Sequence, residues 1–113
     1  MIKIEQVGVE PLQKHSIIID DGTSFSIQIY FSPMQKGWYI TKLQYGDFIL
    51  EGVRIVNSYN ILHQYRNQIP FGIVCLSESN REPMLQEDFY SGASKLYLID
   101  RSEVDQYDRY LRG

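Results

Sequence analysis

The chain of 113 residues has the length of one ordinary domain, and its 43% hydrophobic and 22% charged contents are typical of a globular protein. Its net charge of −3 argues against a protein that neutralises nucleic-acid phosphates. The single cysteine, Cys75, excludes an internal disulfide and a multi-cysteine metal site, and lies in an apolar run that predicts a core position.

The N-terminal segment lacks the pattern of a signal peptide, and no apolar run approaches the roughly 18 residues of a membrane span. We therefore expect a protein that works in a cytosol or is assembled there into something larger.

Residues 2–9 alternate weakly and predict a first strand or an extended arm, which Pro11 ends. Residues 16–20 and 24–31 predict a hairpin whose two-residue loop, Asp21-Gly22, needs the positive φ that glycine supplies. The second strand alternates most clearly. One face carries Phe25, Ile27, Ile29 and Phe31, and the other carries Ser24, Ser26, Gln28 and Tyr30. The polar face of this strand is a candidate contact surface for a partner.

Residues 38–56 predict a second hairpin around Gly46-Asp47. A two-residue loop pairs Leu43 with Leu50 and, one step further, Lys42 with Glu51. The alternation then changes phase at Gly52, which predicts a β-bulge at that glycine.

The C-terminal half contains weaker signals. The spacing predicts a short helix or structured loop over 57–68, a strand over 69–76, a long polar loop over 77–90 and a final strand over 95–100. Ser102 resembles an N-cap, which predicts a short helix to about Arg112 with Val104, Tyr107 and Leu111 on one face.

Together these segments predict an all-β fold, a small antiparallel β-sandwich or barrel of six to seven strands with a short C-terminal helix. We expect one β domain over residues 1–113. Within it, 1–14 form an N-terminal arm or strand, 15–100 the β core and 101–113 a helical extension.

Side chains suited to catalysis or metal binding form no recognisable motif. Two histidines, His15 and His63, and one thiol are too few for a zinc site of the usual kind. The acids Glu78, Glu82, Glu87 and Asp88 gather in one segment, which we interpret as a solvated loop. The sequence thus predicts no catalytic, metal-binding or cofactor-binding residues, and no cofactor.

The aromatic residues allow a second interpretation. Trp38 with Tyr30, Tyr39 and Tyr45 could form a stacking platform for bases or sugars. Strict alternation puts Tyr39 and Tyr45 on the face opposite Trp38, which favours core or interface roles for these rings instead.

The order of several segments resembles a known family. They are Pro11-Leu12, the glycine-turn hairpin from Asp21 to Tyr30, Trp38-Tyr39-Ile40, Gly52-Val53-Arg54, the strand over 71–76, Asp88-Phe89 with Ser91-Gly92, and Leu96-Tyr97-Leu98-Ile99. Over residues 11–100 the chain resembles the cyanophage-like baseplate plug proteins of contractile-tailed bacteriophages. Residues 101–113 extend beyond that resemblance, and residues 2–9 are a second possible difference.

The resemblance implies a non-enzymatic structural protein of the virion, located in the tail baseplate and assembled in the host cytoplasm. It would plug or brace the central hub through contacts with hub and tail tube proteins, with self-association around the tail axis as a further option. It implies no membrane contact and no direct binding of nucleic acid. The expected interface residues are Trp38, Tyr39, Arg54, Phe89, Tyr90 and Tyr107.

Two other functions remain open from the sequence. A small ligand-binding β module for oligosaccharide or single-stranded nucleic acid predicts aromatic rings gathered on one exposed face. An enzyme with a hidden acid pair predicts a cleft with two converging carboxylates from among Glu51, Glu87, Asp88 and Asp100.

Overall fold

The computed structural model describes residues 1–4, 7–8, 10–19, 22–78 and 81–111. In chain order its elements are β1 (Ile2–Lys3), β2 (Leu12–Ile18), β3 (Ser24–Ser32), β4 (Gly37–Tyr45), β5 (Phe48–Leu50), β6 (Val53–Arg54), the 3-10 helix η1 (His63–Tyr65), β7 (Gly72–Ser77), α1 (Asp88–Ser91), β8 (Ser94–Ile99) and α2 (Arg101–Leu111).

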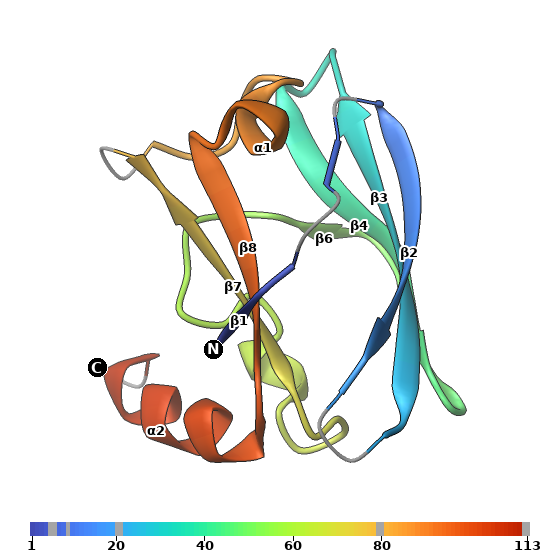
Figure 1. Ribbon diagram of the computed structural model, residues 1–113, viewed down its shortest axis with the longest axis vertical. Coiled ribbons are helices and arrows are strands. Elements are labelled where there is room, and N and C mark those ends of the chain that lie inside the picture. The colour runs from blue at the N-terminus through green and yellow to red at the C-terminus, as the bar shows by residue number, and fades with distance from the viewer. Residues whose placement is uncertain (5–6, 9, 20–21, 79–80, 112–113) are drawn as a thin grey trace.

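The strands form two antiparallel sheets that pack as a sandwich (Figure 1). The large sheet has the order β2-β3-β4-β5, with β6 also paired to β4, and the small sheet has the order β1-β8-β7. This confirms the predicted fold class. The described part of the chain contains eight strands rather than six or seven, because the return strand of the second hairpin is split into β5 and β6.

One hydrophobic cluster fills the space between the sheets. The alternating set predicted for β3, Phe25, Ile27, Ile29 and Phe31, is buried as expected. The ring of Phe25 stacks on that of Phe71 with centroids 4.2 Å apart, which joins the large sheet to the segment entering β7. Burying each such side chain contributes about 1.5–3 kcal/mol relative to leaving it in water.

The first hairpin differs from its prediction in two ways. β2 begins at Leu12 rather than at residue 16, because Pro11 lies at the strand start, where its carbonyl accepts a hydrogen bond from Phe31 N at 2.7 Å and no donor is needed. Ile18 pairs with Ser24, and Ile19 N donates to Thr23 O. The loop therefore has three residues, 20–22, rather than two. Of these only Gly22 is described, and its φ is positive, at 87°. Asp21 of the predicted loop lies outside the described residues. Residues 5–6 and 9 of the predicted first strand also lie outside them.

The second hairpin has the predicted loop, because Tyr45 pairs with Phe48 and Leu43 with Leu50. The ladder stops there, so the predicted pair of Lys42 with Glu51 is not part of it. The predicted bulge at Gly52 is wrong in its position, because the register shift lies between β3 and β4.

The register of β6 on β4, with Ile40 opposite Val53, continues that of β5 without a shift, and Gly52 with φ 77° interrupts the strand. The register change lies instead between β3 and β4, where Gln28 faces Lys42 and Ile29 faces Ile40. Thr41 is therefore the extra residue.

This bulge changes which side chains of β4 point inward. Trp38 and Ile40 are buried before it and Leu43 after it, which moves Tyr45 to the buried face. The ring of Tyr45 packs edge-on against Phe71 at 5.5 Å. The prediction that Tyr45 lies opposite Trp38 is thus wrong, whereas Tyr39 does point outward.

In the C-terminal half, η1 is the only helix within the ambiguous region 57–68 that the structure describes, and β7 and β8 appear near their predicted positions. The loop predicted over 77–90 is not simply solvated. It contains the start of α1, and Asp88 is 1% exposed.

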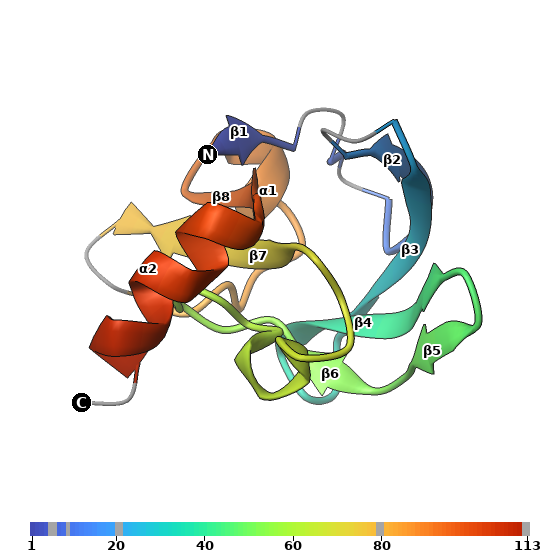
Figure 2. The same cartoon turned by 90° about the horizontal axis from the view of Figure 1, so that it is seen from below.

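Helix α2 forms a third layer on the outer face of the small sheet (Figure 2). Val104 packs in a separate small cluster with Val74 of β7 and Ile99 of β8, and Tyr107 lies beside it. The cap is Asp100 rather than the predicted Ser102. Asp100 Oδ1 accepts from Glu103 N at 2.8 Å, and Glu103 Oε1 accepts from Asp100 N at 3.3 Å, which is a capping box. The side chain of Leu111 lies outside the described part.

Candidate docking surface

The six side chains predicted to act at an interface lie in different places. Trp38 is fully buried and Phe89 is 8% exposed, and their rings meet edge to face at 5.6 Å inside the core. Neither ring can reach a partner while the core stays closed. The burial of Trp38 also removes it from any stacking platform on the surface.

Tyr39 and Arg54 lie together on the outer face of the large sheet. Arg54 Nη1 donates to Tyr39 Oη at 3.1 Å, and the guanidinium carbon lies 5.5 Å from the ring centroid in a cation–π contact. Tyr39 is half-buried and Arg54 exposed, so the planar guanidinium is held in place but still open to a partner.

Strand register extends this pair into a row across four strands. Leu12 of β2 pairs with Tyr30 of β3, Tyr30 with Tyr39 of β4, and Tyr39 with Arg54 of β6. We call these four side chains the outer row. Leu12 is 52% exposed and Tyr30 39%, and large apolar side chains exposed side by side mark interaction surfaces more often than isolated ones do.

The outer row also has a distinct charge environment. The five strands of the large sheet contain no Asp or Glu, whereas they carry Lys14, Lys42 and Arg54. The register aligns Lys14, Gln28 and Lys42 in a second row, beside a shallow groove of about 410 Å³. Among the described residues, none of these three cations is in an ion pair with a carboxylate.

Gly37 gives Arg54 the room that it needs. A Cβ at residue 37 would lie 2.8 Å from Arg54 Nη2, and the same guanidinium nitrogen donates to Lys36 O at 3.4 Å. The glycine at the start of β4 therefore lets the guanidinium lie flat against the backbone and next to Tyr39.

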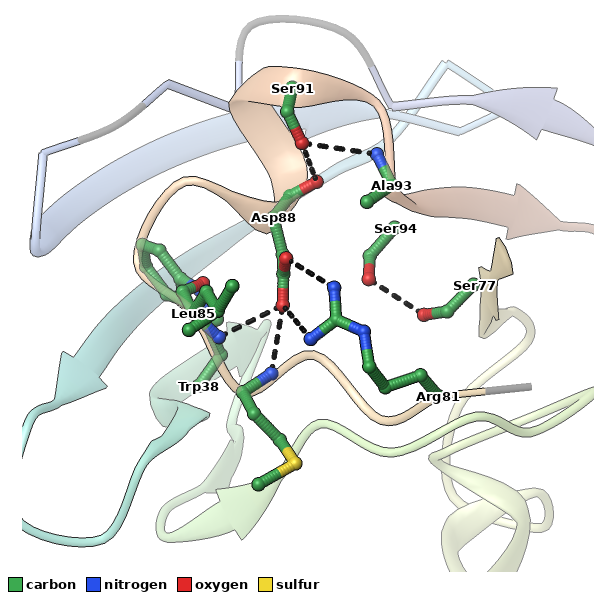
Figure 3. A network of polar contacts seen from close by, with 9 residues as sticks. Trp38, Ser77, Arg81, Leu85, Asp88, Ser91, Ala93 and Ser94 are labelled. Atoms are coloured by element: carbon green, nitrogen blue, oxygen red, sulfur yellow. Dashed lines mark hydrogen bonds and ion pairs between the residues drawn. The ribbon is translucent and has the colours of Figure 1, made fainter. Parts of the chain in front are cut away.

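Tyr90 lies elsewhere, on the short helix α1, and is 71% exposed. Its place is set by its neighbour Asp88, which points inward (Figure 3). Asp88 receives two hydrogen bonds from Arg81, and its Oδ2 also accepts from Met84 N and Leu85 N, both at 2.9 Å. Burial alone would raise the pKa of the Asp88 carboxyl, but these hydrogen bonds outweigh it and hold the pKa below its usual value.

The Asp88 network joins the acidic loop to the core. Trp38 Nε1 donates to Leu85 O at 3.1 Å, so the loop that Asp88 organises also satisfies the buried indole. Ser91 Oγ donates to Asp88 O (Figure 3). Gly92, with φ 88°, ends α1 in the left-handed conformation. The pairs Asp88-Phe89 and Ser91-Gly92 therefore have structural roles. They hold α1 in place, and Tyr90 is the exposed side chain of this helix.

Tyr107 of α2 packs against Tyr59, with ring centroids 5.4 Å apart. The helix is held nearby by Asp108, which pairs with His63 Nε2 at 2.5 Å and Arg66 Nε at 3.1 Å. Tyr59 is 49% exposed, and the two rings form a second aromatic surface away from the outer row.

Two of the four carboxylates of the enzyme hypothesis, Asp88 and Asp100, are engaged in the fold. Asp88 is ion-paired and Asp100 caps α2. Across the described ranges, no group of three or more His, Cys, Asp or Glu side chains could hold a metal ion. His15 is half-buried, and burial lowers its pKa.

Sequence reasoning missed Leu12 as a surface residue and did not connect Tyr30 to Tyr39 and Arg54. These residues become neighbours only through the pairing register of β2, β3, β4 and β6, which local sequence patterns do not give. A three-residue first loop and a bulge at Thr41 are both needed to bring these side chains into line.

These features define a small two-sheet β protein whose described surface carries rows of exposed aromatic and cationic side chains. The model of a family described as "Cyanophage baseplate Pam3 plug gp18" matches residues 1–102, and the chain belongs to this family of phage baseplate plug proteins. No curated protein matches the chain.

The family match ends at residue 102, so nearly all of α2 lies outside it, in agreement with the expectation for residues 101–113. Within the described ranges, no helix is long and apolar enough to cross a membrane.

Proposed function

We propose that this protein is a structural, non-enzymatic component of the phage tail baseplate, which plugs or braces the central hub through protein–protein contacts. It is assembled into the virion in the host cytoplasm. Its partners are the hub protein and the tail tube protein, and copies of the chain gather around the tail axis.

The observation that carries this proposal beyond the family is the outer row. Tyr30, Tyr39 and Arg54 are of the residue types that interface hot spots favour, and Leu12 adds exposed apolar surface beside them. They stand on a rigid sheet with a filled core, which keeps the entropic cost of docking small.

The charge of the sheet indicates the chemistry of the partner surface. The outer face of the large sheet has no acid in its strands, and its cations form no ion pair with a described carboxylate, so it fits a surface of the hub protein that carries carboxylates. Tyr90 and the Tyr59–Tyr107 pair are further contact points on other sides of the molecule.

Quantitative mass spectrometry of purified phage particles tests the location. We expect a small fixed number of copies per particle, far below the number of tail tube subunits. Absence from the particle would contradict the proposal and favour the ligand-binding β module, which binds oligosaccharide or single-stranded nucleic acid without a particle.

Binding to purified hub protein tests the surface. Replacing both Tyr39 and Arg54 with alanine should weaken binding at least tenfold, because the change removes an aromatic ring and the guanidinium held against it. The matched control is Lys95→Ala, which removes an exposed cation from the small sheet instead. Equal binding by the wild type, the double alanine variant and Lys95→Ala would show that the outer row is not the docking surface.

A further inference from the structure

The free edge of β2 is a second feature of the large sheet. β2 pairs with β3 along one side, and within the described ranges no strand pairs with its other side. Ile19 N donates to Thr23 O and Phe31 N to Pro11 O, which fixes the odd-numbered residues as those bonded to β3. The backbone N–H and C=O groups of Leu12, Lys14, Ser16 and Ile18 therefore point away from β3.

A groove lies beside this edge, between β2 and the edge strand β1 of the other sheet. Its volume is about 390 Å³, and its apolar lining includes Ile2, Ile17 and Leu98. A second cavity of about 250 Å³ shares Ile2 and Leu98, so the opening continues along β1. Figure 2 shows β1 and β2 at the same open side of the sandwich.

Apolar side chains remain uncovered at both borders of the groove. Ile18 on β2 is 73% exposed and Ile2 on β1 is 59% exposed. A long edge strand bordered by exposed isoleucines is a ready template for another strand, and proteins normally protect such edges. Here the strand is seven residues long and its middle carries a single outward lysine, Lys14.

The groove is also positively charged. Lys3 and Lys14 line it, and no Asp or Glu is among the described residues that line it. Within the described residues, neither lysine takes part in an ion pair. An occupant with one or more carboxylates would therefore gain charge complementarity, whereas two copies of this chain meeting edge to edge would bring two cationic grooves together.

We propose that the groove binds an extended segment of another baseplate protein, which adds to β2 as a further strand and carries a carboxylate beside its apolar side chains. The backbone of the segment would satisfy the outward groups of β2, and alternate side chains would fill the space against Ile2 and Leu98. This inference rests on the proposed function for the source of the segment, but it uses a different surface from the outer row.

Hydrogen exchange tests strand addition directly, with the free protein and the protein in purified tails as the two samples. In the free protein the amides of Lys14, Ser16 and Ile18 should exchange freely, while those of His15 and Ile17 are protected by β3. In the tail the first three should become at least tenfold slower. If the protein is present in the tail and these amides still exchange freely, strand addition is wrong and the proposed function stands. If the protein is absent from the tail, the proposed function fails first.

A proline substitution provides an independent test. Ser16→Pro removes one outward N–H but no hydrogen bond to β3, and proline is tolerated at such edge positions. Its matched control, Ser16→Ala, keeps that N–H. With both variants shown to be folded by thermal denaturation, we expect at least tenfold fewer copies of Ser16→Pro per particle and an unchanged number of Ser16→Ala.

Two outcomes would overturn the inference. The first is equal incorporation of both variants. The second is a dimer of the free wild-type protein in analytical ultracentrifugation that Ser16→Pro abolishes, because this would place a second copy, rather than a partner segment, on the edge.

Discussion

At the scale of single residues, Asp88 controls more of the structure than its place in an acidic segment indicates. It is buried, receives hydrogen bonds from Arg81 and from two backbone N–H groups, and fixes the loop that also accepts the indole N–H of Trp38. Arg81 is exposed enough for water to replace its partner, so the main cost of losing the carboxylate falls on the N–H groups of Met84 and Leu85, which would lose their acceptor.

We therefore expect Asp88→Asn to lower the free energy of unfolding by about 2 kcal/mol. Urea denaturation followed by tryptophan fluorescence measures this. Glu87→Gln is the matched control, because it removes an acid one position earlier and should change stability by less than about 0.5 kcal/mol. Equal effects of the two substitutions would contradict the structural role of Asp88.

Asp88 also makes the stability of the folded protein depend on pH. Because the folded-state pKa of Asp88 lies below the ordinary value of 3.8, the unfolded chain takes up its proton first as the pH falls. The stability that Asp88 provides is complete at neutral pH and is lost as the pH falls through 3.8 and below. Denaturation midpoints measured between pH 7 and pH 3 should fall more steeply for the wild type than for Asp88→Asn.

Cys75 is a second residue whose environment determines its behaviour. Burial raises the pKa of its thiol to about 12, so almost no thiolate exists at pH 8. We expect iodoacetamide to leave the folded protein unmodified at pH 8 and to add one group per chain once urea unfolds it. Rapid labelling of the folded protein, read by intact mass, would contradict the burial of Cys75.

At the scale of elements, the interruption shared by β4 and the β5–β6 strand shapes the large sheet. Thr41 is an extra residue on one strand, and Gly52 breaks the neighbouring strand nearly opposite it. The part beyond the break carries Tyr39 and Arg54, which the register places in the outer row. Gly37 then provides the space in which Arg54 lies.

This arrangement makes Gly37→Ala an indirect test of the outer row. The added Cβ would displace the end of the Arg54 side chain, which can swing into solvent, so we expect the thermal midpoint to change little. Binding to the hub protein should weaken as much as for Arg54→Ala. The double variant should bind no more weakly than either single variant, and additive losses would show that residue 37 acts by another route.

The elements that could be predicted from sequence are those set by local pattern. The alternation of β3 and the Gly46-Asp47 loop needed only neighbouring residues, and both are confirmed. The start of β2, the position of the bulge and the burial of Asp88 depend on partners far along the chain, and all three were wrong or missed. The outer row was missed for the same reason, because it exists only once four strands are in register.

At the scale of the whole molecule, charge is unevenly distributed. The large sheet has cations and no acid in its strands, whereas eight of the fourteen acids lie between residues 78 and 108. Exposed charges interact over about a Debye length, roughly 10 Å at 0.1 M salt. Docking through the outer face of the large sheet should therefore depend on ionic strength.

We expect the dissociation constant for purified hub protein to rise roughly tenfold between 0.05 and 0.5 M sodium chloride. Lys42→Gln should reduce this salt dependence, because the lysine faces outward beside the groove on that sheet. Lys95→Gln, on the small sheet, should leave it unchanged. A dissociation constant that does not vary with salt would exclude charge complementarity as a main contribution to docking.

The burial of Trp38 also makes this residue an intrinsic fluorescence probe of the protein interior. It is the single tryptophan, it is shielded from solvent, and its indole N–H is bonded to Leu85 O. Its emission should be blue-shifted and resistant to quenching by iodide, and it should report only on the integrity of the interior. A partner that docks on the surface leaves this signal unchanged, so fluorescence can separate assembly from unfolding in one sample without any added dye.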